Sequence, residues 1–221
     1  MKPAALIADM AGTTVQDDGV VLAAFGDALD VISVTGTSER IDALAYVIET
    51  MGQSKIDVFT ALFGETRAID ANRAFEAAYV ERIERDGVAP IPGTEALFSV
   101  LAEEGVALGL TTGFSPRTRQ ALLRALGWDE RISVAISPND AGRGRPYPDM
   151  VLLAAKQLGI ADLSSVVVVG DTQSDIQAGI AAGAGWVVGV ESGTDTAERL
   201  IAAGATHVVA TIADLTLLFA S

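Results

Sequence analysis

Residues 4–15 read AALIADMAGTTV, an apolar run that ends in the carboxylate of Asp9 and continues into small and hydroxylated residues. Parallel strands that are buried on both faces have such continuous apolar runs. In open α/β sheets, ligands bind just beyond the carboxyl ends of the strands. The stretch therefore predicts a first strand with Asp9 at the mouth of a binding site. An Asp that caps a turn through its side chain would fit this stretch alone about as well.

Composition and charge narrow the classes of function. The chain has 221 residues, half of them apolar, which is enough for a sizeable core in one or two domains. A formal net charge of −14 argues against nucleic acid or an anionic membrane surface as a partner. There is no cysteine and one histidine, His207, so a Cys- or His-rich metal site is excluded. We see no signal-peptide pattern and no apolar run of transmembrane length, and we expect a cytoplasmic enzyme.

The order of helix and strand signals predicts the fold class. Residues 16–87 have helical spacing of apolar residues and no strand signal, with a break between helices at 56–63 and 66–86. Strand signals, at 106–111, 132–136, 165–170, 186–190 and 207–209, then alternate with helices, the last of which is predicted at 212–219. This alternation is typical of α/β proteins with a doubly wound parallel sheet. We predict a core domain of residues 1–15 and 88–221, with an all-helical cap domain, 16–87, inserted after the first strand.

Polar stretches follow the predicted strands at their carboxyl ends, where a ligand would bind. Besides Asp9 they are Thr111-Thr112-Gly113, the loop 143–148 and the run 170–175. Asp9 and Asp171 offer hard oxygen ligands, which suit Mg²⁺. The Thr111 hydroxyl and the Arg145 guanidinium can hold a phosphate group.

The other residues of these stretches, and His207, have different expected roles. Gly12 and Gly113 allow the backbone to approach a ligand closely. Asp175 either orients the metal site or caps the helix that begins there. Arg143 is better explained as a solvated loop charge than as a ligand, and His207, remote in the chain, as a structural residue.

The motifs DMAGTT (9–14), TTG (111–113) and GDTQSD (170–175) together resemble those of the haloacid dehalogenase superfamily, and the resemblance extends over the whole chain, the helical cap included. It implies that Asp9 is a nucleophile that forms an aspartyl-phosphate. It implies a phosphoryl site formed by Gly12, Thr13, Thr111, Thr112, Gly113 and Arg145. It also implies a Mg²⁺ site formed by Asp9, the Ala11 carbonyl, Asp171 and Asp175.

Within that superfamily the chain is most similar to the phosphonoacetaldehyde hydrolases. The stretches DMAGTTV (9–15), GRPYP (144–148) and Met51-Gly52-x-x-Lys55 resemble their motifs. The resemblance implies that Lys55 forms a Schiff base with an aldehyde substrate and that two copies pair through their caps. One residue departs from the pattern, because Val58 stands where that family has a histidine.

Ala11 bears on the choice between two reactions. Phosphatases of the superfamily have a general acid two residues after the nucleophile, and Ala11 has no proton to give. Cleavage of a carbon–phosphorus bond next to an imine of Lys55 needs no acid there, because the iminium accepts the electrons. We therefore expect a hydrolase of phosphonoacetaldehyde or a related small phosphonate.

Other interpretations stay open. The main alternative is a phosphatase that acts on a small phosphate monoester such as phosphoglycolate or a sugar phosphate, with Lys55 a solvated cap residue. A non-catalytic binding module is disfavoured, because Asp9, Thr111, Arg145 and Asp171 are all present.

Overall fold

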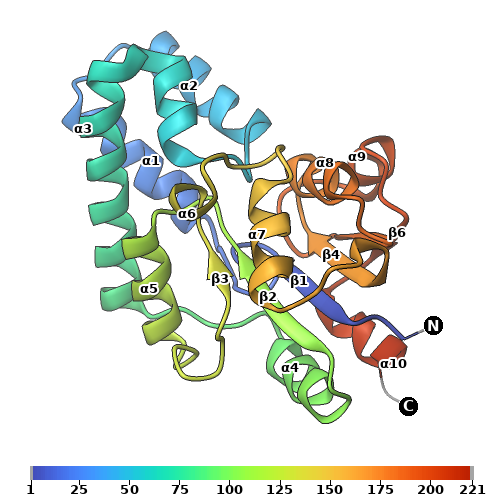
Figure 1. Cartoon of the computed structure of the whole chain (residues 1–221). Coiled ribbons are helices and arrows are strands. Elements are labelled where there is room, and N and C mark those ends of the chain that lie inside the picture. The colour runs from blue at the N-terminus through green and yellow to red at the C-terminus, as the bar shows by residue number, and fades with distance from the viewer. Residues whose placement is uncertain (1, 220–221) are drawn as a thin grey trace.

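The computed structural model describes residues 2–219 and confirms the α/β class (Figure 1). Six parallel strands form one sheet in the order β3-β2-β1-β4-β5-β6. Their bounds are β1 Ala5–Asp9, β2 Ala107–Thr111, β3 Ala135–Ile136, β4 Val166–Gly170, β5 Trp186–Val190 and β6 His207–Val209. Because the chain winds from β1 in both directions, the crevice beside the end of β1 is where such a sheet binds ligands.

The first strand lies at the centre of the sheet and is buried along its whole length. Side chains of a strand alternate between its two faces. Leu6 and Ala8 accordingly enter one hydrophobic cluster, and Ala5 and Ile7 enter another. Burial on both sides explains why the run is continuously apolar up to Asp9.

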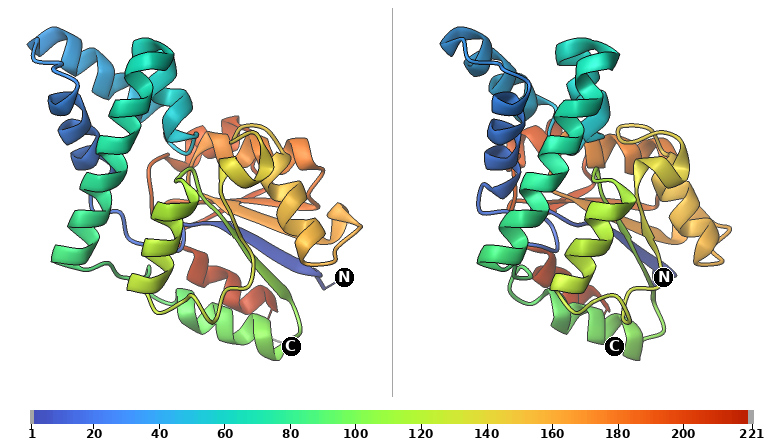
Figure 2. Two further views of the ribbon diagram at one scale, coloured as in Figure 1. Left: turned by 60° about the vertical axis from the view of Figure 1, so that its left-hand side comes forward. Right: turned by 90° about the vertical axis from the view of Figure 1, so that its left-hand side faces the viewer.

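Helices cover both faces of the sheet (Figures 1 and 2). One face is covered by α7 (Asp149–Gln157), α8 (Gln173–Ala182) and α9 (Ala197–Ala202). The other is covered by α4 (Thr94–Glu103) and α10 (Thr216–Phe219). Two further helices, α5 (Pro116–Ala125) and α6 (Pro138–Ala141), follow β2 and β3.

Three helices, which we call the cap helices, follow β1: α1 (Val20–Val31), α2 (Thr37–Glu49) and α3 (Lys55–Asp86). Of these, α1 and α3 pack on each other through aromatic rings, with Phe25 4.8 Å from Phe59 and 4.6 Å from Phe75 between ring centroids, and α2 packs against α1. Figure 2 shows them standing beside the sheet as a separate group. Within α3, Gly64 has a non-helical backbone, at the predicted break. The domain boundaries at residues 15 and 88 stay a prediction.

Two element predictions need correction. The third strand is Ala135–Ile136 instead of 132–136, because the amide of Ile132 bonds back to the carbonyl of Trp128 in a turn. The predicted helix 212–219 is a 3₁₀ turn, Ile212–Leu215, followed by α10. Within residues 2–219, no helix combines the length and the apolar character needed to span a bilayer.

Candidate active site

Asp9 is the last residue of β1 and is 5% exposed. The strand register pairs it with Thr111 of β2, and the same register places the end of β4 on its other side. The turn after it is held by Thr14, whose hydroxyl donates to the carbonyl of Asp9 at 2.9 Å. The predicted nucleophile is therefore fixed between two strand ends by sheet hydrogen bonds and by its own turn.

Gly12 brings this turn against the end of β4. Its φ of +88° lies in the left-handed region, and a Cβ there would lie 2.5 Å from a carboxylate oxygen of Asp171. Only glycine satisfies both conditions. The Gly-Thr pair of the motif has a second use, because Thr13 donates its hydroxyl hydrogen bond to Asp171 at 2.9 Å.

Asp171 directly follows β4 and is 1% exposed. Besides Thr13, the backbone N–H of Thr194 donates to it at 2.8 Å. Burial, and then the nearby charges of Asp9 and Asp175, raise the pKa of this carboxyl well above its ordinary value. The site thus holds more negative charge than its protein environment neutralises.

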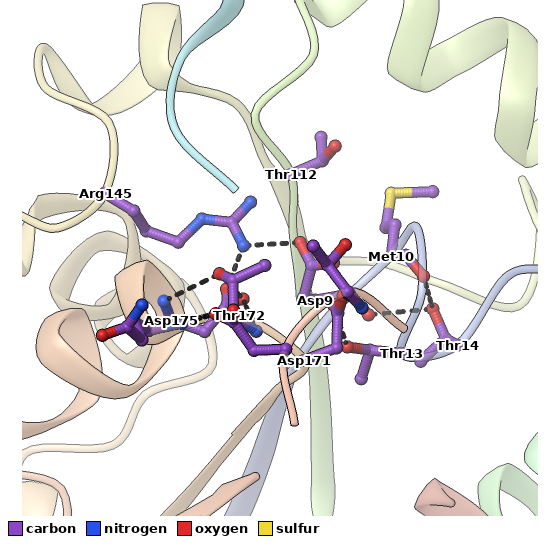
Figure 3. A network of polar contacts seen from close by, with 12 residues as sticks. Asp9, Met10, Thr13, Thr14, Thr112, Arg145, Asp171, Thr172 and Asp175 are labelled. Atoms are coloured by element: carbon purple, nitrogen blue, oxygen red, sulfur yellow. Dashed lines mark hydrogen bonds and ion pairs between the residues drawn. The ribbon is translucent and has the colours of Figure 1, made fainter. Parts of the chain in front are cut away.

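Arg145 spans the site from the loop before α7, as Figure 3 shows. It lies 2.7 Å from Asp9 and also pairs with Asp175. Burial opposes its charge, but the two carboxylates outweigh that effect and raise the pKa of the guanidinium. Its Nε is buried with no hydrogen-bond partner in the described chain, so donor capacity remains for an anionic ligand.

Asp175 caps the start of α8, one of its two predicted roles, and also pairs with Arg145. One carboxylate oxygen accepts hydrogen bonds from the backbone N–H (3.1 Å) and the hydroxyl (2.5 Å) of Thr172, which forms a capping box at the start of α8. The other oxygen pairs with Arg145. The helix cap therefore fixes the carboxylate that orients Arg145.

The carboxylates of Asp9, Asp171 and Asp175 offer oxygen atoms that all lie within 4.8 Å of one another. All three residues are buried. Burial raises the pKa of Asp9 as well, since the opposing effect of Arg145 is smaller. Hard oxygen donors with surplus negative charge fit a divalent cation such as Mg²⁺.

Lys55 begins α3 and is 7% exposed. Its Nζ lies 5.8 Å from the ring centroid of Phe25 and 5.7 Å from that of Phe114. Burial, and then the charge of Arg145, lower its pKa to about 8. The predicted Schiff-base residue is thus a buried amine that loses its proton more readily than an ordinary lysine.

One cavity of about 410 Å³ joins these groups. Its wall includes most of the predicted site residues, which are Asp9, Ala11, Gly12, Lys55, Thr112, Gly113, Arg145 and Asp171. Thr13 and Asp175 lie behind the wall, where they support Asp171 and Arg145.

Thr111 does not line the cavity, although we expected its hydroxyl to meet the phosphate. It is still within β2 and is buried in the sheet beside Asp9, and the wall is formed by the next two residues, after the strand ends. Arg143 pairs with Asp149 at 3.0 Å and lies 4.4 Å from the Tyr147 ring, consistent with the expected loop charge. His207 is exposed on β6 and does not line the cavity.

Sequence reasoning missed several parts of the wall, two of which carry polar groups that bear on the site. The first is the loop after β5, where Ser192 donates to the carbonyl of Gly12 at 2.8 Å and Thr194 donates to Asp171. The polar run 191–195 follows a strand end just as the other motifs do, so the same rule could have found it. The second is Asp17, which no motif marks.

The family model of haloacid dehalogenase-like hydrolases matches residues 3–183. The chain belongs to the haloacid dehalogenase-like hydrolase family. This hydrolase is 33% identical over 213 residues to a phosphonoacetaldehyde hydrolase of Bacillus cereus, a match that covers 88% of the chain and 78% of the relative. It is 31% identical over 157 residues to the phosphonoacetaldehyde hydrolase of Parabacteroides distasonis, covering 59% of the chain and 58% of the relative.

Among solved structures, this hydrolase is similar to a hydrolase from Pseudomonas syringae. The TM-score is 0.83 at 26% identity, and the match covers 96% of this chain and 95% of that one. The superfamily that the three motifs indicated is thus confirmed, and so is the expectation of a hydrolase.

Proposed function

We propose that this hydrolase cleaves the carbon–phosphorus bond of phosphonoacetaldehyde or a related small phosphonate. The position of Lys55 carries the proposal. Its buried amine, with a pKa of about 8, lines the same cavity as Asp9 and Arg145. The two relatives named phosphonoacetaldehyde hydrolase support the same choice of substrate.

The reaction begins at Lys55. Its neutral amine attacks the aldehyde carbon, and protonation of the carbinolamine hydroxyl followed by loss of water leaves an iminium on Nζ. A depressed pKa increases the fraction of neutral amine near neutral pH. The rings of Phe25 and Phe114 keep water from the side of Nζ that they cover.

Asp9 then attacks phosphorus and forms an aspartyl-phosphate. The phosphorus–carbon bond breaks, and its electron pair passes into the iminium to give an enamine. Arg145 holds Asp9 and offers its remaining donors to the phosphoryl oxygens. Mg²⁺, held by Asp9, Asp171, Asp175 and the carbonyl of Ala11, would supply positive charge beside the transferring group.

Ala11 fits this reaction. It lines the cavity two residues after Asp9 and carries no proton. Because the iminium accepts the electron pair, no general acid is needed at that position. Water then hydrolyses the aspartyl-phosphate, and protonation and hydrolysis of the enamine release the aldehyde product and free Lys55.

A phosphatase for a small phosphate monoester, such as phosphoglycolate or a sugar phosphate, is the alternative. One observation favours it: Val58 is 3% exposed and packs in the hydrophobic core, so that position offers no acid or base to imine chemistry. The groups around Asp9 would serve either reaction.

A phosphate-release assay separates the two. We expect the parent with Mg²⁺ to release phosphate from phosphonoacetaldehyde, and Lys55→Arg to lower that rate by about 10³-fold or more, because an arginine cannot form the imine. Asp9→Asn should lower it by about 10⁴-fold or more, and a chelator should abolish it. Phosphate release from a monoester but not from phosphonoacetaldehyde, at a rate that Lys55→Arg leaves unchanged, would establish the phosphatase instead.

A cytoplasmic location and pairing of two copies through the cap helices stay predictions from the sequence.

A further inference from the structure

Asp17 lies on the wall of the active-site cavity, where the turn after β1 enters the cap helices. Two hydrogen bonds fix it at the start of α1. Its carbonyl accepts from the N–H of Val20 at 2.7 Å, and its Oδ1 accepts from the N–H of Val21 at 3.0 Å. The side chain is half-buried, and in the described chain nothing donates a hydrogen bond to its Oδ2.

Lys55 lines the same cavity, and in the described part of the chain nothing accepts a hydrogen bond from its Nζ. Burial raises the pKa of Asp17, and the charge of Lys55 opposes that shift. Conversely, the charge of Asp17 raises the pKa of Lys55 against the larger effect of burial. The two groups are therefore close enough for each to influence the protonation of the other.

Other charged groups act on this pair. Arg145 lowers the pKa of Lys55, whereas Asp9 and Asp171 raise it. On the side of Asp17, the neighbouring charge of Asp18 raises its pKa. Burial, and then the charges of Asp17 and Asp9, raise the pKa of the Tyr79 hydroxyl on α3.

The other carboxylates on the wall are already engaged or face solvent. Asp9 pairs with Arg145, and Asp171 accepts from Thr13 and Thr194. Asp18 is exposed. Asp17 is the carboxylate of this wall that combines partial burial, a fixed position and an oxygen free of hydrogen bonds.

We propose that Asp17 is the acid–base group for Lys55 and carries the proton that imine formation has to move. The inference rests on the proposed function and adds a catalytic residue to it. Asp17 and Lys55 line the same cavity but form no ion pair among the described residues, so a water in the cavity carries the proton from the Lys55 ammonium to the Asp17 carboxylate. This leaves a neutral amine and a carboxylic acid. The amine attacks the aldehyde carbon, and a proton shifts from nitrogen to oxygen to give the neutral carbinolamine.

Dehydration completes the step. Asp17 donates its proton to the carbinolamine hydroxyl, the carbon–oxygen bond breaks, and water leaves. The nitrogen lone pair forms the second bond to carbon, which gives the iminium. Two protons have left Nζ, one through Asp17 and one by the shift from nitrogen to oxygen. Both end in the departing water, and Asp17 ends as the carboxylate with which it began.

The variant that tests the proposal is Asp17→Asn, with Asp18→Asn as its matched control. An asparagine Oδ1 can still accept from Val21, and Asn tolerates the left-handed backbone of Asp18 (φ 42°). The readout is the rate at which borohydride traps phosphonoacetaldehyde on Lys55, located by peptide mass. We expect Asp17→Asn to slow trapping about 10²-fold and Asp18→Asn to leave it within a few-fold of the parent.

A purely electrostatic role predicts the opposite sign. Removing the Asp17 charge lowers the pKa of Lys55, which increases the fraction of neutral amine at about pH 7. Titration of Lys55 with a small acylating reagent should reveal that fall. Trapping that is slowed although more free amine is present then identifies proton transfer. Asp17→Ser, which keeps a hydroxyl acceptor at that position but cannot titrate, should reproduce the loss if Asp17→Asn folds poorly.

Trapping by Asp17→Asn and Asp17→Ser at or above the parent rate would overturn the role of Asp17 and leave Schiff-base chemistry in place. Equal slowing by Asp18→Asn would also overturn it, because the effect would then belong to the loop as a whole. If the parent itself gives no adduct on Lys55, both this inference and the proposed carbon–phosphorus cleavage fail.

Discussion

Arg145 connects the nucleophile to the helix cap, because it pairs with Asp9 at one end of the site and with Asp175 at the other. All three residues are buried, so each charge depends on its neighbours for stabilisation. Breaking a buried pair leaves an uncompensated charge and is costly, whereas an exposed pair contributes little. This contrast separates Arg145 from Arg143, two residues earlier in the same loop.

Arg145→Ala should lower kcat/KM by about 10²–10³-fold, because a clamp on phosphoryl charge is worth about 3–4 kcal/mol in the transition state. Arg143→Ala is the matched control. Arg143 is exposed and interacts with Asp149 and Tyr147 on the surface, so its loss should change kcat/KM by less than a few-fold. The comparison is made by measuring kcat/KM of both variants well below their melting temperatures. Equal effects of the two substitutions would place the phosphate elsewhere.

At the scale of elements, the connection between α2 and α3 rests directly on the loop after β2. The backbone N–H of Lys55 donates to the carbonyl of Gly113 at 3.4 Å. A Cβ on Gly113 would lie 2.5 Å from the carbonyl oxygen of Gln53 and 3.2 Å from that of Gly52. Both neighbours are backbone atoms, which cannot rotate away. The absence of a side chain at Gly113 thus sets how closely Lys55 approaches Asp9.

Gly113→Ala should therefore displace the α2–α3 connection and lower kcat/KM by about 10–10²-fold, since a shift of about 1 Å in catalytic geometry has that effect. Gly36→Ala is the control. It is the N-cap residue just before α2, with an ordinary φ of −67°, and a Cβ there would meet nothing nearer than 3.8 Å. We expect it to keep full activity and to change the free energy of unfolding by less than about 1 kcal/mol, because the entropy gain of Gly→Ala is opposed by the poorer N-cap. Full activity of Gly113→Ala would mean that the connection does not position Lys55.

Across the whole molecule, the buried carboxylates couple stability to pH and to metal. Burial raises the pKa of Asp9 and of Asp171 above the ordinary value of about 4. Above that value the folded chain binds more protons at these groups than the unfolded chain does. Their contribution to the free energy of unfolding is therefore fully present at low pH and is lost as the pH rises through the raised values.

In a chelator, the melting temperature should consequently fall between about pH 5 and about pH 8. Excess Mg²⁺ should raise it more at the upper pH than at the lower, because a cation binds the ionised carboxylates of the folded state. Differential scanning calorimetry at both pH values, with and without Mg²⁺, measures the effect. Asp171→Asn should remove most of the Mg²⁺ dependence. A gain from Mg²⁺ that is equal at both pH values would argue against a metal site formed by this cluster.

What the sequence determined by itself is the set of strands and the residues at their ends. The continuous apolar runs that end at Asp9 and at Gly170 predicted β1 and β4, because a strand that is buried on both faces needs apolar side chains on both. The carboxyl ends of parallel strands meet at one edge, so Asp9, Asp171 and Arg145 could be placed together from their positions in the chain.

Only the tertiary structure decided which neighbouring side chain faces the cavity. Thr112 lines it and Thr111 does not, because β2 ends between them. Asp17 belongs to the wall because α1 and α3 pack against each other and bring it to the side of Lys55. The periodicity of a strand or helix is local and can be predicted from the order of neighbouring residues. The direction in which a loop side chain points depends on how distant elements pack, so a short stretch of sequence does not predict it.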